Sequence, residues 1–77
     1  MTRIKIKDLR QGMRVVEYGY GRAVETTIRE DARLTETPGQ FGYVAIGDTQ
    51  NGWAVEFFEC HEGSPYGPHL YLLEVGQ

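Results

Sequence analysis

The sequence predicts one small all-β domain over residues 1–77, a barrel of five or six short antiparallel strands. Short runs in which apolar and polar side chains alternate are rich in β-branched and aromatic residues, and glycine- or proline-containing turns separate them. A chain this short buries only about 60% of the surface that it exposes when unfolded. Its core is therefore small, and self-association would add to its stability.

The N-terminal third alternates charged and apolar residues in the way that strands do. Residues 3–7 place basic side chains on one face and isoleucines on the other, and a turn at residues 8–12 leads to an extended run at residues 13–18. Glycines on both sides of Tyr20 favour a hairpin that exposes this ring at its tip.

Residues 22–34 fit both a helical and a strand spacing. Val24, Ile28 and Ala32 suit a helix, whereas Val24, Thr26 and Ile28 suit a strand. The β-branched residues favour a strand that bends or ends near residues 30–31.

The C-terminal half is expected to supply the remaining strands. A loop at residues 35–40 precedes a strand at residues 41–46, and an Asn-Gly corner in residues 48–52 turns the chain back. Glycine and proline interrupt residues 63–68, and the last strand is expected at residues 70–75.

The segment GWAVEFFECHE, residues 52–62, is expected to be the strand around which the barrel packs. Alternation places Trp53, Val55 and Phe57 on one face and Ala54, Phe58 and Cys60 on the other, so both faces are apolar. A central strand buried on both sides is favoured over a subunit interface. The expected inner layer consists of Trp53, Val55, Phe57, Val15, Ile28 and Leu72.

Phe58 is surplus to that layer. We therefore expect a homo-oligomer with Phe58, Ala54 and Cys60 near the centre of its interface. The alternative is that Tyr18 or the loop at residues 35–40 covers Phe58 within one chain.

Charge is distributed unevenly along a chain of net charge −3, because all eight basic residues lie within the first 33 positions. We interpret this asymmetry as pairing of opposite charges on neighbouring strands. Cys60, the only cysteine, cannot form a disulfide within the chain, which favours a reducing cytoplasm. Neither a signal peptide nor a transmembrane helix is expected.

The sequence offers little support for catalysis, and no cofactor or metal is expected. On a strand, Cys60 and His61 would point to opposite faces and could not form a nucleophile–base pair. Cys60, His61 and His69 lack the spacing of a structural zinc site. Glycines around Tyr20 lack the lysine and helix of a phosphate-binding loop.

Aromatic residues are the best candidates for binding. Tyrosine is enriched where a surface recognises a partner, although some of these rings could instead complete a small core. The candidate binding residues are Tyr18, Tyr20, Tyr66, His69 and Tyr71.

The order of strands resembles an SH3-like barrel, with residues 65–68 standing where such barrels carry a single helical turn. Residues 52–56, GWAVE, are similar to a strand of the type II, plasmid-borne dihydrofolate reductases, which are SH3-like barrels that assemble as tetramers around a shared pore. The region matching their ligand-binding Val-Gln-Ile-Tyr segment is residues 68–71, where only Tyr71 is retained. The resemblance thus implies a compact, self-associating barrel of mobile-element type, and reductase activity is not carried over.

Three functions follow from these observations. The favoured function is a non-enzymatic, self-associating module that binds a protein or peptide through its tyrosines. A nucleic-acid-binding barrel is the second, opposed by the acidity of the chain; its candidate residues are Arg3, Lys5, Lys7 and Arg14. An oligomeric pore enzyme is the third, with His69 and Tyr71 as its polar groups.

Overall fold

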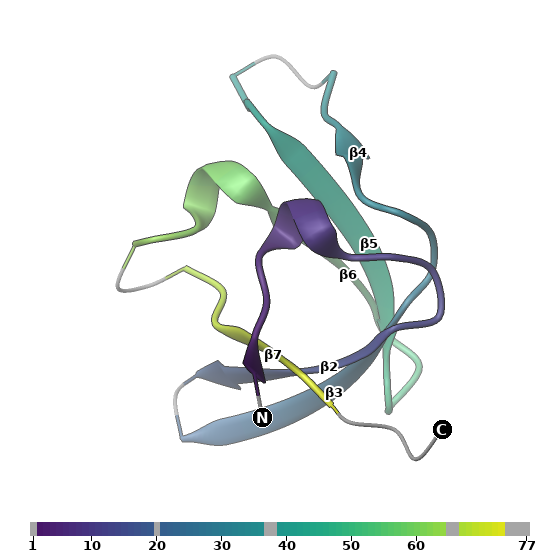
Figure 1. Cartoon of the computed structure of the whole chain (residues 1–77). Coiled ribbons are helices and arrows are strands. Elements are labelled where there is room, and N and C mark those ends of the chain that lie inside the picture. Colours follow the sequence, from purple (N-terminus) through teal and green to yellow (C-terminus); the bar gives the residue numbers. More distant parts are fainter. Residues whose placement is uncertain (1, 20, 37–38, 65–66, 74–77) are drawn as a thin grey trace.

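A computed structural model describes residues 2–19, 21–36, 39–64 and 67–73. These residues form one antiparallel sheet and two 3-10 turns (Figure 1). In chain order the elements are β1 (Thr2–Arg3), η1 (Ile6–Asp8), β2 (Arg14–Gly19), β3 (Arg22–Ile28), β4 (Arg33–Leu34), β5 (Tyr43–Thr49), β6 (Ala54–Phe58), η2 (Glu59–His61) and β7 (Leu70–Leu72).

The sheet follows the order β1-β7-β2-β3-β5, and both β4 and β6 also pair with β5. It curls into a half-barrel, with β2 and β3 crossing below β5 in Figure 1. A 3-10 turn follows β6, on the way to β7. The prediction of a small all-β barrel of short antiparallel strands is confirmed.

The expected bend near residues 30–31 is also confirmed. β3 ends at Ile28 and β4 begins at Arg33, and both strands pair with β5 on the edge opposite β6. Residues 22–34 therefore contain two strand segments and no helix. The bend lets one stretch of chain follow the curvature of β5, which a straight strand of that length could not do.

Gly47 on β5 permits the close approach of β3. It lies opposite Ile28, and a Cβ atom there would come within 2.5 Å of Thr26 Cγ2 and 3.0 Å of the Thr27 carbonyl oxygen. Such contacts are closer than packed atoms tolerate, so a side chain would push the two strands apart.

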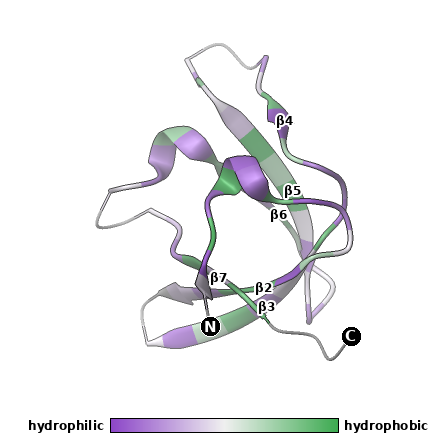
Figure 2. Ribbon diagram, viewed as in Figure 1, coloured by the Kyte–Doolittle hydropathy of each residue, from purple (hydrophilic) through white to green (hydrophobic). Residues whose placement is uncertain are grey.

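The core lies on the concave face of the sheet, and the N-terminal segment fills its open side. Ile6 and Leu9 are completely buried and η1 packs against β5 (Figure 1). In Figure 2 the η1 turn has an apolar part, coloured green, next to polar residues, coloured purple. The buried core cluster consists of Ile6, Leu9, Val15, Ile28, Ala45, Phe57 and Leu70.

The predicted strand at residues 3–7 is wrong beyond Arg3. Hydrogen bonds from Asp8 N–H to the Lys5 carbonyl and from Leu9 N–H to the Ile6 carbonyl form a 3-10 turn instead. This turn brings Ile6 and Leu9, three residues apart, into the same core, where a strand would have separated their faces.

The predicted role of residues 52–62 is corrected in two respects. Within the described residues β6 pairs with β5 alone, so it is an edge strand rather than a central one. Trp53 precedes the strand and is 72% exposed, so it does not belong to the core. Phe57 is buried and Val55 packs against the core, as predicted.

A helical turn precedes the segment where the sequence predicted one. The structure has a 3-10 turn at Glu59–His61, directly after β6. Gly67 and Pro68 lie outside any helix or strand, and Pro65 and Tyr66 fall outside the described residues.

We predict that Gly47→Ala lowers the free energy of unfolding by about 1–3 kcal/mol, because the new methyl group overlaps Thr26 Cγ2. Urea denaturation followed by circular dichroism measures this change.

A double-mutant cycle with Thr26→Ser checks the cause. Serine lacks Cγ2, so the double variant Gly47→Ala, Thr26→Ser should lose less free energy of unfolding than the two single variants lose in sum. Strict additivity would show that the Thr26 methyl group is not the obstacle.

Candidate binding surface

The outer face of the sheet carries two contacting tyrosines. Val15 is buried in the core. Side chains alternate along a strand, so Val16 and Tyr18 lie on the opposite, outer face of β2. Val16 lies opposite Tyr71 on β7. The Tyr18 and Tyr71 rings meet edge to face, with centroids 5.4 Å apart and planes at 76°. Tyr18 is 39% exposed and Tyr71 is half-buried, so both rings are accessible from solvent.

A polar pair adjoins the rings. Arg3 on β1 lies opposite Tyr71, and its Nη2 atom is 3.1 Å from Nδ1 of His69. Arg3 is the donor in this contact, because a guanidinium group carries no acceptor. The backbone N–H of Tyr18 donates to the His69 carbonyl at 3.1 Å. These four residues, Arg3, Tyr18, His69 and Tyr71, are called the tyrosine surface below.

Of the five candidate binding residues, the structure brings Tyr18, His69 and Tyr71 together. Tyr20 and Tyr66 lie outside the described residues. Sequence reasoning assigned Arg3 to a separate basic strand and missed its place beside Tyr71, because only the β1–β7 register joins residues so far apart in the chain.

A cavity of about 390 Å³ opens at one end of the barrel, beside β6. Glu17 shares the inward face of Val15 and lies opposite Val24 and Leu70. Burial raises the pKa of the Glu17 carboxyl above its ordinary value of 4.5, and the nearby His69 partly opposes that rise. Sequence alternation could have identified this inward-facing carboxylate.

The cysteine and histidine at the rim of this cavity do not form a catalytic pair. They lie on η2 rather than on a strand, which corrects the prediction. The Cys60 thiol donates to Oε1 of Gln40 at 2.7 Å, whereas the His61 ring packs edge to face on Phe58 with centroids 5.6 Å apart. Within the described residues, no group of three histidine, cysteine or acidic side chains could hold a metal ion.

The residues expected at an oligomer interface have different environments. Ala54 is exposed, whereas Phe58 and Cys60 are half-buried. The His61 ring covers part of Phe58, and Gln40, at the end of the 35–40 loop, contacts Cys60 within the same chain.

The basic residues considered for nucleic acid are divided between two places. Arg14 forms an ion pair with Glu25 on β3. Arg3, Lys5 and Lys7 line an open groove of about 530 Å³, which Glu59 and Glu62 share.

Both acids of this groove are already engaged by backbone donors. The N–H of Ile6 donates to Oε2 of Glu62 at 2.7 Å, and the N–H of Tyr43 donates to Oε1 of Glu59 at 3.0 Å. Two carboxylates thus lie next to the lysines, which weakens the groove as a phosphate site.

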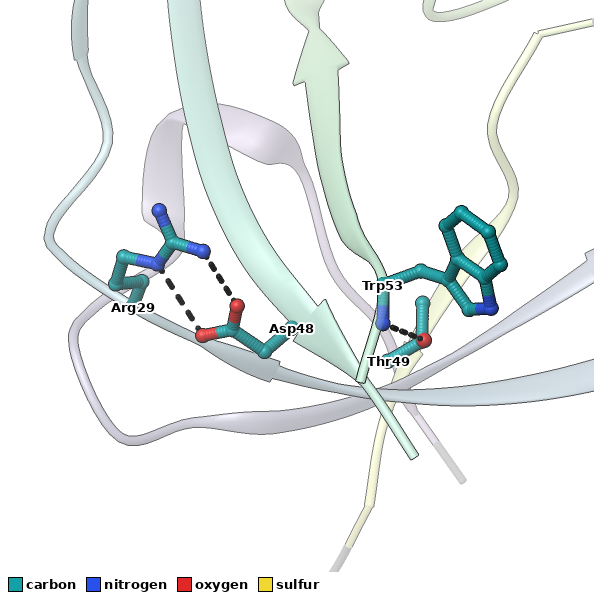
Figure 3. A network of polar contacts seen from close by, with 4 residues as sticks. All are labelled: Arg29, Asp48, Thr49 and Trp53. Atoms are coloured by element: carbon teal, nitrogen blue, oxygen red, sulfur yellow. Dashed lines mark hydrogen bonds and ion pairs between the residues drawn. The ribbon is translucent and has the colours of Figure 1, made fainter. Parts of the chain in front are cut away.

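Opposite charges pair across the sheet at one more place. Arg29 forms two hydrogen bonds with Asp48, Nε to Oδ2 at 3.2 Å and Nη2 to Oδ1 at 2.5 Å (Figure 3). These hydrogen bonds lower the pKa of Asp48. This pair joins the basic and acidic halves of the chain, as the charge pattern predicts.

Comparison with protein-family models, with curated proteins and with solved structures finds no match to this chain. None of the helices in the described part of the chain has the length and apolar character needed to span a membrane.

Glu17 gives a pH-dependent prediction. Its raised pKa means that the folded protein holds the proton more tightly than the unfolded chain, so stability falls as the pH rises from 4.5 through the folded-state pKa. Glu17→Gln cannot ionise. The difference in melting temperature, variant minus wild type, should therefore be more positive at about pH 7 than at about pH 4.

Carbon-13 NMR of the side-chain carboxyl tests the cause directly. We expect the Glu17 resonance to titrate above 4.5. A midpoint at or below that value would contradict the inward placement of this carboxylate.

Proposed function

We propose that the protein is a non-enzymatic binding module that recognises a segment of a partner protein with its tyrosine surface. The observation that carries this proposal is the edge-to-face pair of Tyr18 and Tyr71 on the outer face of the sheet. Tyrosine rings offer large contact areas with little loss of side-chain freedom, and their hydroxyls can bond to a partner. A pair fixed by strand register is already arranged before binding.

The chemistry around the rings favours an acidic segment. Arg3 contacts the imidazole of His69, and within the described residues no carboxylate forms an ion pair with Arg3. Its charge is therefore available to a carboxylate of the partner, while the rings contact apolar side chains. The single cysteine favours a cytoplasmic setting for this recognition.

Protein is favoured over nucleic acid by the surrounding charge. Arg14 is already paired with Glu25, and Glu59 and Glu62 lie beside the lysines. With a net charge of −3, long-range attraction to phosphate backbones is weak.

Selection from a displayed peptide library tests the proposal. Peptides enriched on the wild-type protein should bind Tyr71→Ala at least about tenfold more weakly, because truncation removes one half of the ring pair. Arg3→Gln should weaken acidic peptides and make their binding less sensitive to salt.

Phe41→Ala is the matched control. Phe41 is an aromatic residue that is 69% exposed at the β4–β5 end of the molecule, and its loss should leave affinity unchanged. Peptides that bind wild type, Tyr18→Ala and Tyr71→Ala equally well would place recognition elsewhere.

A further inference from the structure

β6 presents a free edge whose backbone groups can be assigned. The N–H of Thr49 donates to the Trp53 carbonyl at 2.7 Å, so Trp53 is the hydrogen-bonded partner of Thr49 across β5 and β6. Hydrogen-bonded pairs alternate along an antiparallel ladder, so Val55 and Phe57 also turn their backbone groups toward β5. Ala54, Glu56 and Phe58 consequently direct theirs to the other edge.

This edge carries few of the features that prevent strand addition. Within the described residues, β6 pairs with no strand except β5. Its sequence, AVEFF, contains one charge and no proline or lysine. Ala54 and Glu56 are exposed, so a second strand can approach them. Natural proteins usually protect such an edge or use it for pairing.

Trp53, just before β6, is a second feature that the monomer leaves unexplained. Its N–H donates to Oγ1 of Thr49 at 3.0 Å, which fixes its backbone, while the indole ring stands clear of the hairpin (Figure 3). The residue is 72% exposed. A fixed, exposed tryptophan at the end of an open edge is well placed to contact whatever pairs with that edge.

We propose that the free edge of β6 pairs antiparallel with the same edge of a second copy of the chain, about a two-fold axis at Val55. Residues with outward backbone groups must face one another, and the symmetric registers that pair more than one such residue of β6 in each chain have their axis at Val55, Glu56 or Phe57. An axis at Glu56 places two like charges directly opposite, which is destabilising. An axis at Phe57 pairs little chain, because η2 begins at Glu59.

The axis at Val55 avoids both problems. It places Ala54 opposite the partner's Glu56, so each carboxylate faces a methyl group and each Ala54–Glu56 pair exchanges two backbone hydrogen bonds. It also places Trp53 opposite the partner's Phe57, beside the cavity that Phe57 helps to line. The open edge and the exposed tryptophan are then explained by one contact. The tyrosine surface is built from β1, β2, β7 and His69, and it includes no residue of β6, so this inference does not depend on the proposed function.

Sedimentation equilibrium between about 1 and about 100 micromolar protein tests the pairing. Wild type should pass from monomer to dimer, and emission from Trp53, the only tryptophan, should shift to shorter wavelength over the same range. A wild-type protein that stays monomeric at about 100 micromolar would overturn the proposal, whatever else binds the edge.

Glu56→Pro is the decisive variant, because it removes an outward N–H and leaves the hydrogen bonds between β5 and β6 in place. It should be monomeric with an unchanged circular dichroism spectrum, whereas the matched control Glu56→Gln, which keeps the N–H, should still dimerise. A folded Glu56→Pro dimer would contradict pairing through this edge.

Trp53→Ala supplies a second test that does not depend on the fold of the proline variant. The side chain is exposed, so the monomer should fold, and dimer affinity should fall at least about tenfold. Unchanged dimer affinity would overturn the register with its axis at Val55.

Discussion

The sheet ends before it closes on itself, and the rest of the structure depends on this open seam. β6 lies at one end of the sheet and β1 at the other, and within the described residues they do not pair. Side-chain contacts with the N-terminal segment, rather than strand pairing, join the two ends of the sheet. The Glu62 carboxylate accepts a hydrogen bond from Ile6 N–H at 2.7 Å, and Ile6 and Leu9 fill the space behind it. The half-buried Glu62 carboxylate thus satisfies a backbone donor of a completely buried residue, which would be costly to leave without a partner.

The same seam explains where the polar and accessible features lie. The barrel-end cavity adjoins the free side of β6, and the inward-facing Glu17 lines it. Tyr18 and Tyr71, on the outer face of β2 and β7, are not among the residues that hold the seam. These tyrosines can therefore serve the recognition that we propose, and the free edge of β6 can serve the self-association that we propose.

Much of the fold could be predicted from local signals. Glycines flanking Tyr20 indicated the β2–β3 turn, and the β-branched run ending at Ile28 indicated a strand with a bend after it. Alternation also assigned Phe57 to the core. It could not show that β6 is an edge strand, because a strand that is apolar on both faces has the same sequence pattern at an edge as at the centre. Trp53 was misplaced because the alternation was extended to a residue that precedes the strand, which begins at Ala54.

The errors in the N-terminal segment and in the site have different physical causes. Ile6 and Leu9 stand three residues apart, a spacing that suits a 3-10 turn, but short alternation at residues 3–7 suited a strand equally well. The tyrosine surface was predicted in part. Tyr18 and Tyr71 were chosen for their chemistry, whereas the contribution of Arg3 depends on a register between strands at the two ends of the chain, which local sequence does not encode.

Amide hydrogen exchange along β6, measured by NMR at low protein concentration where the chain is monomeric, tests the open seam most directly. The amides of Val55 and Phe57 face β5 and should exchange slowly, whereas those of Ala54 and Glu56 face the free edge and should exchange fast. Equal protection of Glu56 and Val55 in the monomer would show that another part of the chain closes the barrel, and would contradict this account.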